Sequence, residues 1–524
     1  MRSLIIHGHF YQPPRENPWT GIVEAEPSAA PFHDWNERIH SECYRPNASA
    51  QIFDPLGGED RLVNNYANIN FNFGPTLLSW LEPNHPDTYA RIIAADRDSA
   101  AKRGGHGNAI AQAYGHAILP LCNERDLRTQ IRWGVADFRY RFAREPQALW
   151  LPETACNDAV MSALIDEGFR FVILAPHQAA RVRARYRTPT NRGSDRVDVS
   201  ANRTQWREVN EQEIDTSVSY HYSHRDGSAR SIAVFFYDGP TSRAIAFENL
   251  LRSSHELVER FAQRANGKEL LNIATDGETY GHHFKFGDVC LAHALEIEAP
   301  ARGFEITNYS EYLDEHPPAV EVQINSGPGD EGSSWSCPHG VSRWIRDCGC
   351  HTGGEPGWNQ AWRTPLREAL DFLRDNNIEH FEATRGQFFT DPWKARDGSI
   401  ALILDQNHSR ERFLYEQAGR WLSANEQWRA LTYLELQRML LLMYTSCGWF
   451  FNNISGIETI QILKYAARAI DLMEQLGLPS VSDRFLEILA DAKSNRLEMK
   501  TGADIYRRFV EPLKPSRVQE PMPA

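Results

Sequence analysis

Short apolar runs alternate with amphipathic helical patterns over the first 315 residues, and this alternation constrains the fold more than any other feature. An apolar run of four to seven residues is typical of a parallel strand that is covered on both faces, and a helical pattern is typical of the crossover between two such strands. Eight runs fit this description: 4–9, 69–73, 109–113, 148–152, 169–175, 232–237, 270–275 and 304–307. Seven or eight such units favour a closed β/α barrel over an open sheet.

Polar side chains follow most of these runs at the point where each run ends. A barrel brings the carboxyl ends of its strands together at one mouth, so these side chains are expected to meet there. Any one of them is equally well explained as an ordinary turn residue, but their recurrence favours a catalytic pocket. They are His7, His9, Gln12, Asn70, Asn72, Glu153, His177, Asp238, Asp276, Glu278, Thr307 and Asn308.

Two of these strand ends carry acids that could act as a pair. The motif W-L-P-E ends in Glu153, and the run 270–275 is followed at once by Asp276. Two carboxyl groups on either side of one bond are the minimum equipment for glycoside hydrolysis, with roughly 5–5.5 Å between them for retention and roughly 6.5–9.5 Å for inversion. Asp238 is a reserve candidate for the acid, and an N-cap of the next helix explains it equally well.

Histidines supply the second set of candidate site residues. His7 and His9 are separated by one residue at a strand end, a spacing that suits metal ligands and also suits hydrogen bonds to sugar hydroxyls. We favour sugar binding because no further ligand motif with fixed spacing accompanies the pair. His282 and His283 follow Asp276 closely and are expected to orient it or the substrate, whereas His116 fits a pocket residue and a core residue equally well.

The rest of the chain departs from the β/α rhythm. We expect a catalytic barrel at 1–315, with a long excursion at 178–230, then an irregular, loop-rich connection over the barrel mouth at 316–363 and a helical domain at 364–524. In the connection, Trp335 is a candidate sugar platform, with core packing as the alternative. The same connection contains Cys337, His339, Cys348, Cys350 and His351, which fit either a zinc site or buried thiols, although the usual C-x₂-C spacing is missing.

Composition excludes several classes of function. A net charge of -13 gives no basic surface for nucleic acid or for an anionic membrane. No apolar run approaches the length of a membrane span. Eight cysteines in 524 residues favour reduced thiols and a cytoplasmic protein over a disulfide scaffold.

Four motifs in order resemble those of glycoside hydrolase family 57: H-G-H-F-Y-Q-P (7–13), G-H-G-N (105–108), W-L-P-E (150–153) and T-D-G-E-T-Y-G (275–281). Members of that family are retaining enzymes that act mainly on α-glucans. The resemblance implies a distorted (β/α)7 barrel without an obligatory metal, with Glu153 as nucleophile and Asp276 as general acid/base. It also implies that His7, His9 and Gln12 line the sugar site. The helical part resembles a domain of unknown function that accompanies a divergent branch of these proteins.

The sequence therefore predicts an α-amylase, 4-α-glucanotransferase or branching enzyme that acts on α-1,4-linked glucans without a cofactor. Its partner would be an oligo- or polysaccharide, bound through His7, His9, Gln12, His116, Asp238, Glu278, His282, His283 and Trp335. Two alternatives stay open, namely a metal-dependent carbohydrate hydrolase or deacetylase that uses His7, His9 and Asp276, and a non-catalytic glucan-binding protein. The sequence decides neither the glucan, nor the acceptor, nor the oligomeric state.

Overall fold

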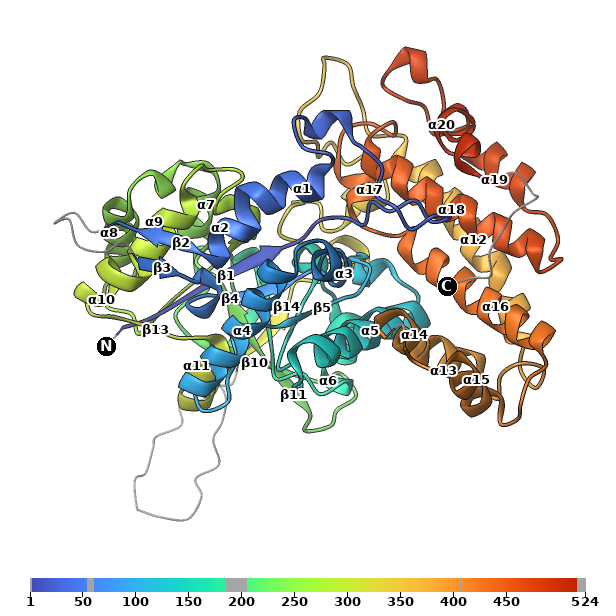
Figure 1. Cartoon of the computed structure of the whole chain (residues 1–524). Helices are drawn as coiled ribbons and strands as arrows, with labels where there is room; N and C mark the ends of the chain where they lie inside the picture. The colour runs from blue at the N-terminus through green and yellow to red at the C-terminus, as the bar shows by residue number, and fades with distance from the viewer. Residues whose placement is uncertain (1, 54–60, 185–204, 406, 516–524) are drawn as a thin grey trace. The chain divides into compact units, whose positions relative to one another are not determined.

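The computed structural model describes residues 2–53, 61–184, 205–405 and 407–515 (Figure 1). The chain divides into two compact units. The barrel unit comprises Met1–Gln12, Ser28–Gln112 and Arg141–Ser336, and the helical unit comprises Pro13–Pro27, Ala113–Tyr140 and Cys337–Ala524. The predicted excursion at 178–230 belongs to the barrel unit, and its residues 185–204 lie outside the described residues.

Seven strands form a ring in the barrel unit, each joined to the next. They are β1 (Arg2–Phe10), β4 (Asn70–Phe73), β5 (Ala111–Gln112), β6 (Leu149–Trp150), β7 (Phe171–Leu174), β11 (Ser231–Phe236) and β12 (Leu270–Asp276). The pairs β1–β4, β5–β6, β7–β11 and β12–β1 are parallel ladders. Parallel bridges join β4 to the chain before β5 and β6 to β7. The ring closes where the Asp238 N–H donates to the Asn272 carbonyl, so the predicted β/α barrel is confirmed.

The eighth predicted strand lies beside the ring. Strand β13 (Phe304–Ile306) pairs in parallel with the first residues of β1, whereas β4 pairs with the last four residues of β1. One strand therefore has two neighbours along the same edge. This arrangement explains why eight apolar runs yield a seven-stranded ring.

Alternate residues of the barrel strands form one apolar core. Ile5, Trp150, Phe171 and Phe235 belong to this core together with Tyr309, and each of them is at most 1% exposed. Because side chains alternate across a strand, every second residue is left to point the other way. The same few strands therefore carry both the apolar core residues and the polar groups at the strand ends.

A second group of strands extends the sheet beyond β11. The order is β7-β11-β10-β14-β8-β9, with β8 (Ala179–Ala184), β9 (Arg207–Glu208), β10 (Ser219–Ser223) and β14 (Val320–Ile324). Strand β14 arises from the segment 316–363, and its alternating sequence V-E-V-Q-I fits its half-buried pattern. Short strands β2 (Ala50–Ile52) and β3 (Arg61–Val63) pair separately.

Helices connect the strands of the barrel unit, as the alternation predicted. They are α1 (Trp35–Ile39), α2 (Arg45–Ala48), α3 (Pro75–Asn84), α4 (Pro86–Lys102), α6 (Asp158–Asp166), α7 (Gly239–Phe247), α8 (Ser254–Arg264), α9 (Gly287–His293), α10 (Ala299–Ala301) and α11 (Tyr309–Glu315). Helix α5 (Glu124–Phe142) lies mostly within the helical unit.

The helical unit is dominated by helices coloured from yellow-orange to red in Figure 1. They are α12 (Arg363–Glu382), α13 (Pro392–Gly398), α14 (Ile400–Leu404), α15 (Arg410–Ala418), α16 (Ala424–Leu442), α17 (Cys447–Phe450), α18 (Ile457–Gln475), α19 (Ser482–Leu489) and α20 (Gly502–Phe509). Helix α16 begins with a capping box of Ser423 and Glu426, and its apolar face packs on α18. The predicted C-terminal helical region is thus confirmed. Every described helix is too short or too polar to cross a membrane.

Candidate active site

Glu153 lies on a tight turn that follows β6. Pro152 opens a short 3₁₀ turn, and Glu153 adopts left-handed backbone angles of φ 58° and ψ 21°. Such angles are uncommon for a residue with a side chain and persist only where the surroundings hold them. Here the Glu153 carbonyl accepts the Trp335 N–H at 3.0 Å, and Cys156 exchanges two backbone hydrogen bonds with Ser333. The segment 333–336 thus fixes the turn.

The same segment binds the Glu153 side chain. Oε2 of Glu153 accepts hydrogen bonds from Trp335 Nε1 at 3.1 Å and from Ser336 Oγ at 2.6 Å. Hydrogen bonds donated to a carboxylate favour its ionised form and restrict its orientation. The two donors therefore fix the position of the Glu153 carboxyl group.

Asp276 lies at the end of β12, opposite His9 in the β1–β12 ladder. Its side chain is accessible to solvent, although protein surrounds the carboxyl group. Burial of the carboxyl, together with the charge of Glu153, raises the pKa of Asp276 to about 7. The strand end therefore presents a carboxylic acid that is half protonated near neutral pH, within electrostatic reach of Glu153.

Glu278 is a second acid at this strand end. It is 7% exposed, and its Oε1 accepts hydrogen bonds from the Tyr11 N–H at 3.0 Å and from Tyr44 Oη at 2.7 Å. Burial and the charge of Asp276 raise the pKa of Glu278 to about 8, so Glu278 is neutral at pH 7. Gly277 between the two acids is required, because a Cβ there would lie 2.2 Å from the Phe10 ring.

His7 and His9 are linked through the amide of Asn72. Asn72 Oδ1 lies 3.0 Å from His7 Nε2, and Asn72 Nδ2 lies 3.0 Å from His9 Nδ1 and 2.6 Å from Gln112 Oε1. Burial lowers the pKa of both imidazoles to about 3, so both are neutral.

The two imidazoles do not combine with Asp276 into a ligand cluster. We considered groups of three or more potential metal ligands whose donor atoms lie within 4.8 Å of one another. Among the described residues, no such group contains His7, His9 or Asp276. Trp150 instead stacks on His7 and His9, with ring centroids 4.6 and 5.1 Å apart. Neutral, stacked imidazoles suit hydrogen bonding to hydroxyl groups.

Trp335 adds an aromatic surface beside Glu153. Its ring meets Trp150 edge-on at 5.2 Å and Tyr237 at 6.4 Å, and it is only partly buried. An indole that donates to the carboxylate and leaves part of its ring accessible suits a sugar platform.

The remaining predicted residues have other partners. Asp238 is fully buried, caps α7 through Thr241 and forms an ion pair with Arg264 at 2.7 Å. Burial acts to raise the pKa of Asp238, but the hydrogen bonds from Arg264 and Thr241 outweigh it and hold the pKa below its ordinary value. The N-cap reading of Asp238 is therefore the one that the structure supports.

Three more predicted residues of the barrel unit have local partners. His282 pairs with Glu42 through Nδ1, and the side chain of Gln12 donates to the Tyr11 carbonyl at 3.1 Å. Burial and the neighbouring His282 lower the pKa of His283 to about 4. These contacts leave the contribution of all three to substrate binding a prediction.

His116 belongs to the helical unit, apart from the other predicted residues in the division of the chain. Its imidazole is 1% exposed, and Nδ1 lies 2.7 Å from Ser446 Oγ. Its backbone is left-handed, with φ 53°. These contacts fit the interpretation as a satisfied core histidine.

Sequence reasoning missed several residues of the site. Ser336 and Tyr44 donate to Glu153 and Glu278, respectively, yet neither belongs to a strand-end motif. Asn72 is among the predicted strand-end residues and lies one residue before the end of β4, but its position between two histidines does not follow from the sequence. Gln112 ends β5, so the rule that polar residues at strand ends line the mouth would have identified it as well.

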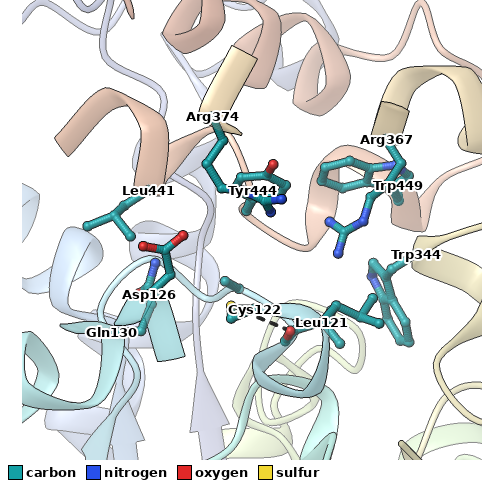
Figure 2. A pocket seen from close by; sticks show the side chains of 12 residues that line it. Leu121, Cys122, Asp126, Gln130, Trp344, Arg367, Arg374, Leu441, Tyr444 and Trp449 are labelled. Carbon is teal, nitrogen blue, oxygen red and sulfur yellow. Dashed lines mark hydrogen bonds between the residues drawn. The ribbon is translucent and has the colours of Figure 1, made fainter. Parts of the chain in front are cut away.

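A pocket in the helical unit is separate from these acids. Figure 2 shows Trp344, Tyr444 and Trp449 in its wall, with Arg367 and Arg374 beside them. The Arg367 guanidinium lies 5.1 Å from the centre of the Tyr444 ring and 5.3 Å from that of Trp449. These cation–π contacts account for the arginines as packing partners of the aromatic wall.

The chain matches two family models. The model described as "Glycosyl hydrolase family 57" covers residues 10–325, and that of a "Domain of unknown function (DUF3536)" covers residues 358–519. The first match includes Glu153, Asp276 and Glu278. The second covers most of the C-terminal helices.

Three proteins of similar sequence or structure are named as amylases or as a branching enzyme. "Alpha-amylase 1" of Dictyoglomus thermophilum is 26% identical over 107 residues, which are 20% of this chain and only 15% of that protein's length. A maltose-forming amylase from Pyrococcus sp. ST04 superposes with a TM-score of 0.66 and 15% identity over 97% of this chain and 92% of that chain. A branching enzyme from Pyrococcus horikoshii gives a TM-score of 0.51 and 14% identity over 99% and 98%.

These two superpositions show that the folds are alike. Because the sequence identities are low, they show nothing beyond the fold. The family match rests on sequence and extends over more than half of the chain. The chain therefore belongs to glycosyl hydrolase family 57.

Proposed function

We propose that the protein is a retaining enzyme that hydrolyses or transfers α-1,4-linked glucans, with Glu153 as nucleophile and Asp276 as general acid/base. Family membership supports the reaction class. The names of the similar amylases and of the branching enzyme support the glucan substrate. The observation that carries the proposal is the pair of acids in contrasting surroundings, because double displacement needs one ionised and one protonated acid. Glu153 accepts two hydrogen bonds on one oxygen, whereas burial and the charge of Glu153 raise the pKa of Asp276 to about 7.

In the first step, a Glu153 carboxylate oxygen attacks the anomeric carbon. The bond from that carbon to the glycosidic oxygen breaks, and Asp276 gives its proton to the departing oxygen. The hydrogen bonds from Trp335 and Ser336 hold the nucleophile in place during the attack. The product is a covalent glycosyl ester of Glu153 and a free sugar chain.

The second step uses the electrostatic coupling between the two acids. The charge of Glu153 contributes to the raised pKa of Asp276, and the ester removes that charge. Asp276 is already a carboxylate after giving its proton to the departing oxygen, and the lower pKa keeps it ionised until it acts as the base for the incoming acceptor. Asp276 takes a proton from water in hydrolysis or from a sugar hydroxyl in transfer, and the attack releases Glu153.

His9 and Trp335 are the residues that we assign to sugar binding beside the cleaved bond. The imidazole of His9 is neutral, and its register position opposite Asp276 places it at the same strand end, where an imidazole can hydrogen-bond to a sugar hydroxyl. Trp335 offers the aromatic face. A cytoplasmic location accords with the eight cysteines, all of which are free thiols.

Turnover of malto-oligosaccharides and amylose by the wild-type protein and by Glu153→Gln tests the proposal. We expect the variant to lose activity by a factor on the order of 10⁴ or more, because the nucleophile is gone. Equal activity of the two proteins would overturn the role of Glu153.

The stereochemistry provides an independent check. Proton NMR of the first sugars released should show the α-anomer, because two displacements retain configuration. Azide should restore turnover of an α-glycosyl fluoride by Glu153→Ala and yield the β-glycosyl azide, since azide then displaces fluoride once. Initial release of the β-anomer by the wild-type protein would show inversion and exclude the covalent intermediate.

A further inference from the structure

Three cysteines and one histidine of the helical unit bring their donor atoms together. The sulfur atoms of Cys337, Cys348 and Cys350 and one ring nitrogen of His339 all lie within 4.8 Å of one another. The four residues come from the segment between β14 and α12. The named elements of that segment are the 3₁₀ turns Pro328–Asp330 and Ser342–Trp344. The cluster shares no residue with the acids and histidines proposed for the glycosidase reaction.

The distances within the cluster match the edges of a zinc tetrahedron. Zn–S bonds of about 2.3 Å and Zn–N bonds of about 2.0–2.1 Å give edges of roughly 3.8 Å between two sulfurs and roughly 3.5 Å between sulfur and nitrogen. Cys337 Sγ lies 3.8 Å from Cys348 Sγ and 3.7 Å from Cys350 Sγ, and Cys350 Sγ lies 3.5 Å from His339 Nδ1. A disulfide would instead require about 2.05 Å between two sulfurs.

We propose that Cys337, His339, Cys348 and Cys350 bind one structural Zn²⁺ ion. Binding converts the three thiols to thiolates, so three protons pass to solvent while His339 coordinates as a neutral imidazole through Nδ1. Three soft sulfur ligands and one imidazole in tetrahedral arrangement select zinc over Mg²⁺ or Ca²⁺. Four protein ligands leave no open position, which assigns the ion a structural role.

The charges around the cluster fit three thiolates better than three thiols. The site with its ion carries a net charge of one negative unit, and two buried arginines, Arg343 and Arg363, lie close to it. Arg363 is fully buried and donates to the Cys350 carbonyl at 3.0 Å.

Backbone donors also point to thiolate sulfur. The backbone N–H groups of Arg343 and His339 both bond to Cys337. Such N–H···S bonds stabilise a sulfur ligand and fix its orientation, as outer contacts of metal sites do. Cys337 is 2% exposed, so it anchors the cluster on its inner side.

The second histidine of the segment is not part of the cluster. His351 directly follows Cys350, but its Nδ1 accepts the Gly353 N–H at 3.1 Å. Of the two histidines that the sequence offers, only His339 therefore has its ring nitrogen near the sulfurs. The pair provides a matched control within one loop.

Metal analysis of the purified full-length chain tests the proposal directly. After dialysis against metal-free buffer we expect about one zinc per chain by plasma mass spectrometry. Replacement by Co²⁺ should give the d–d absorption near 600–750 nm that is typical of tetrahedral sulfur coordination. Iron in place of zinc, or metal-free protein that fails to take up one equivalent of Zn²⁺, would overturn the proposal.

Four variants locate the ion. His339→Ala and Cys350→Ser should lose most of the bound zinc, whereas His351→Ala and Cys447→Ser should keep it. Equal zinc content in His339→Ala and His351→Ala, or equal loss in all four variants, would contradict the assignment.

Thiol labelling keeps the test decisive if a ligand variant fails to fold. In the wild-type protein, Cys348 and Cys350 should resist a maleimide reagent and become reactive after a zinc chelator is added, as shown by peptide mass spectrometry. Labelling at the same rate before and after chelation, or recovery of a disulfide among the three cysteines, would exclude the zinc site.

Discussion

The turn at Glu153 and the strand end at Asp276 place the same functional group, a carboxyl group, in opposite surroundings. Glu153 has left-handed backbone angles and receives two side-chain hydrogen bonds on one carboxylate oxygen. Asp276 ends a regular strand with φ -58° and ψ 135°, and burial dominates the shift of its pKa. At Glu153 hydrogen-bond donors favour a negative charge, whereas at Asp276 the surrounding protein and the charge of Glu153 disfavour it. The proposed roles of nucleophile and acid therefore rest on the difference in surroundings between the two carboxyl groups.

The two regions are also coupled. The Glu153 charge is one of the causes that raise the pKa of Asp276, and the Asp276 charge is one of those that raise the pKa of Glu278. A change at one carboxyl group should therefore be measurable at the next. The following variants separate the donor effect, the charge effect and the burial effect.

Among these variants, Asp276→Asn is expected to have the largest effect on activity, and it tests the acid side of the comparison between Glu153 and Asp276. The variant cannot protonate the departing oxygen, so kcat/KM on maltotetraose should fall by roughly 10²–10⁴-fold. An α-glycosyl fluoride should suffer a much smaller loss in its first step, because fluoride leaves without a proton. Equal losses on both substrates, measured by initial rates, would remove Asp276 from the acid role.

The charge effect should appear in the pH dependence of kcat/KM. The acid must be protonated, so the rate of the wild-type protein should fall as pH rises above about 7, the pKa to which burial and Glu153 raise Asp276. In Glu153→Gln the pKa of Asp276 should be lower, because the neighbouring charge is gone. Titration of ¹³C-labelled aspartate by NMR would measure it, and an unchanged or higher pKa would refute the coupling.

A smaller effect is expected when one donor to Glu153 is removed. Ser336→Ala deletes the hydrogen bond of 2.6 Å, and a bond to a charged group contributes about 1.5–3 kcal/mol, so kcat/KM should fall about 10- to 150-fold. Trp335→Phe keeps an aromatic ring and removes the other donor. Ser326→Ala in the same loop is the control and should retain wild-type kinetics. If Ser336→Ala retains full activity, donors do not hold the nucleophile.

The sequence predicts the strand-end acids because their signal is local. Apolar runs that end in Glu153 and Asp276 follow from the needs of parallel strands, and the barrel brings such ends together. The N-cap role of Asp238 is likewise local, because the hydrogen bond that shows it comes from the backbone N–H of Thr241, three residues on. Secondary structure and the acid pair thus depend on neighbours within a few residues.

The parts that were missed depend on distant segments. Ser336 reaches Glu153 across 183 positions of the chain, and Tyr44 reaches Glu278 across 234. Strand β14 is short and lies among Gly- and Pro-rich turns, so its pattern is too brief to distinguish from a loop. The zinc cluster departs from the usual spacing between ligand pairs, and only the fold brings its sulfurs together.

The smallest effect on activity is expected for Glu278→Gln, which isolates burial from donors and from catalysis. Glu278 is neutral in the folded protein at pH 7, so the neutral amide should change kcat/KM little. Its effect should appear in stability. The unfolded chain releases the Glu278 proton near the ordinary value of 4.5, whereas the folded chain keeps it until about 8. Between these values the folded state binds more protons, so wild-type stability declines as pH rises.

The variant lacks this decline, and urea unfolding at pH 5 and at pH 8 would measure it. Relative to the wild-type protein, the free energy of unfolding of Glu278→Gln should increase by up to about 1.4 kcal/mol for each pH unit between 5 and 8. Glu248→Gln, at an exposed position of the same unit, should show no such trend. Parallel trends for the two variants would mean that burial at the β12 strand end does not hold Glu278 in its acid form. The same burial could then not be invoked for Asp276, two residues earlier.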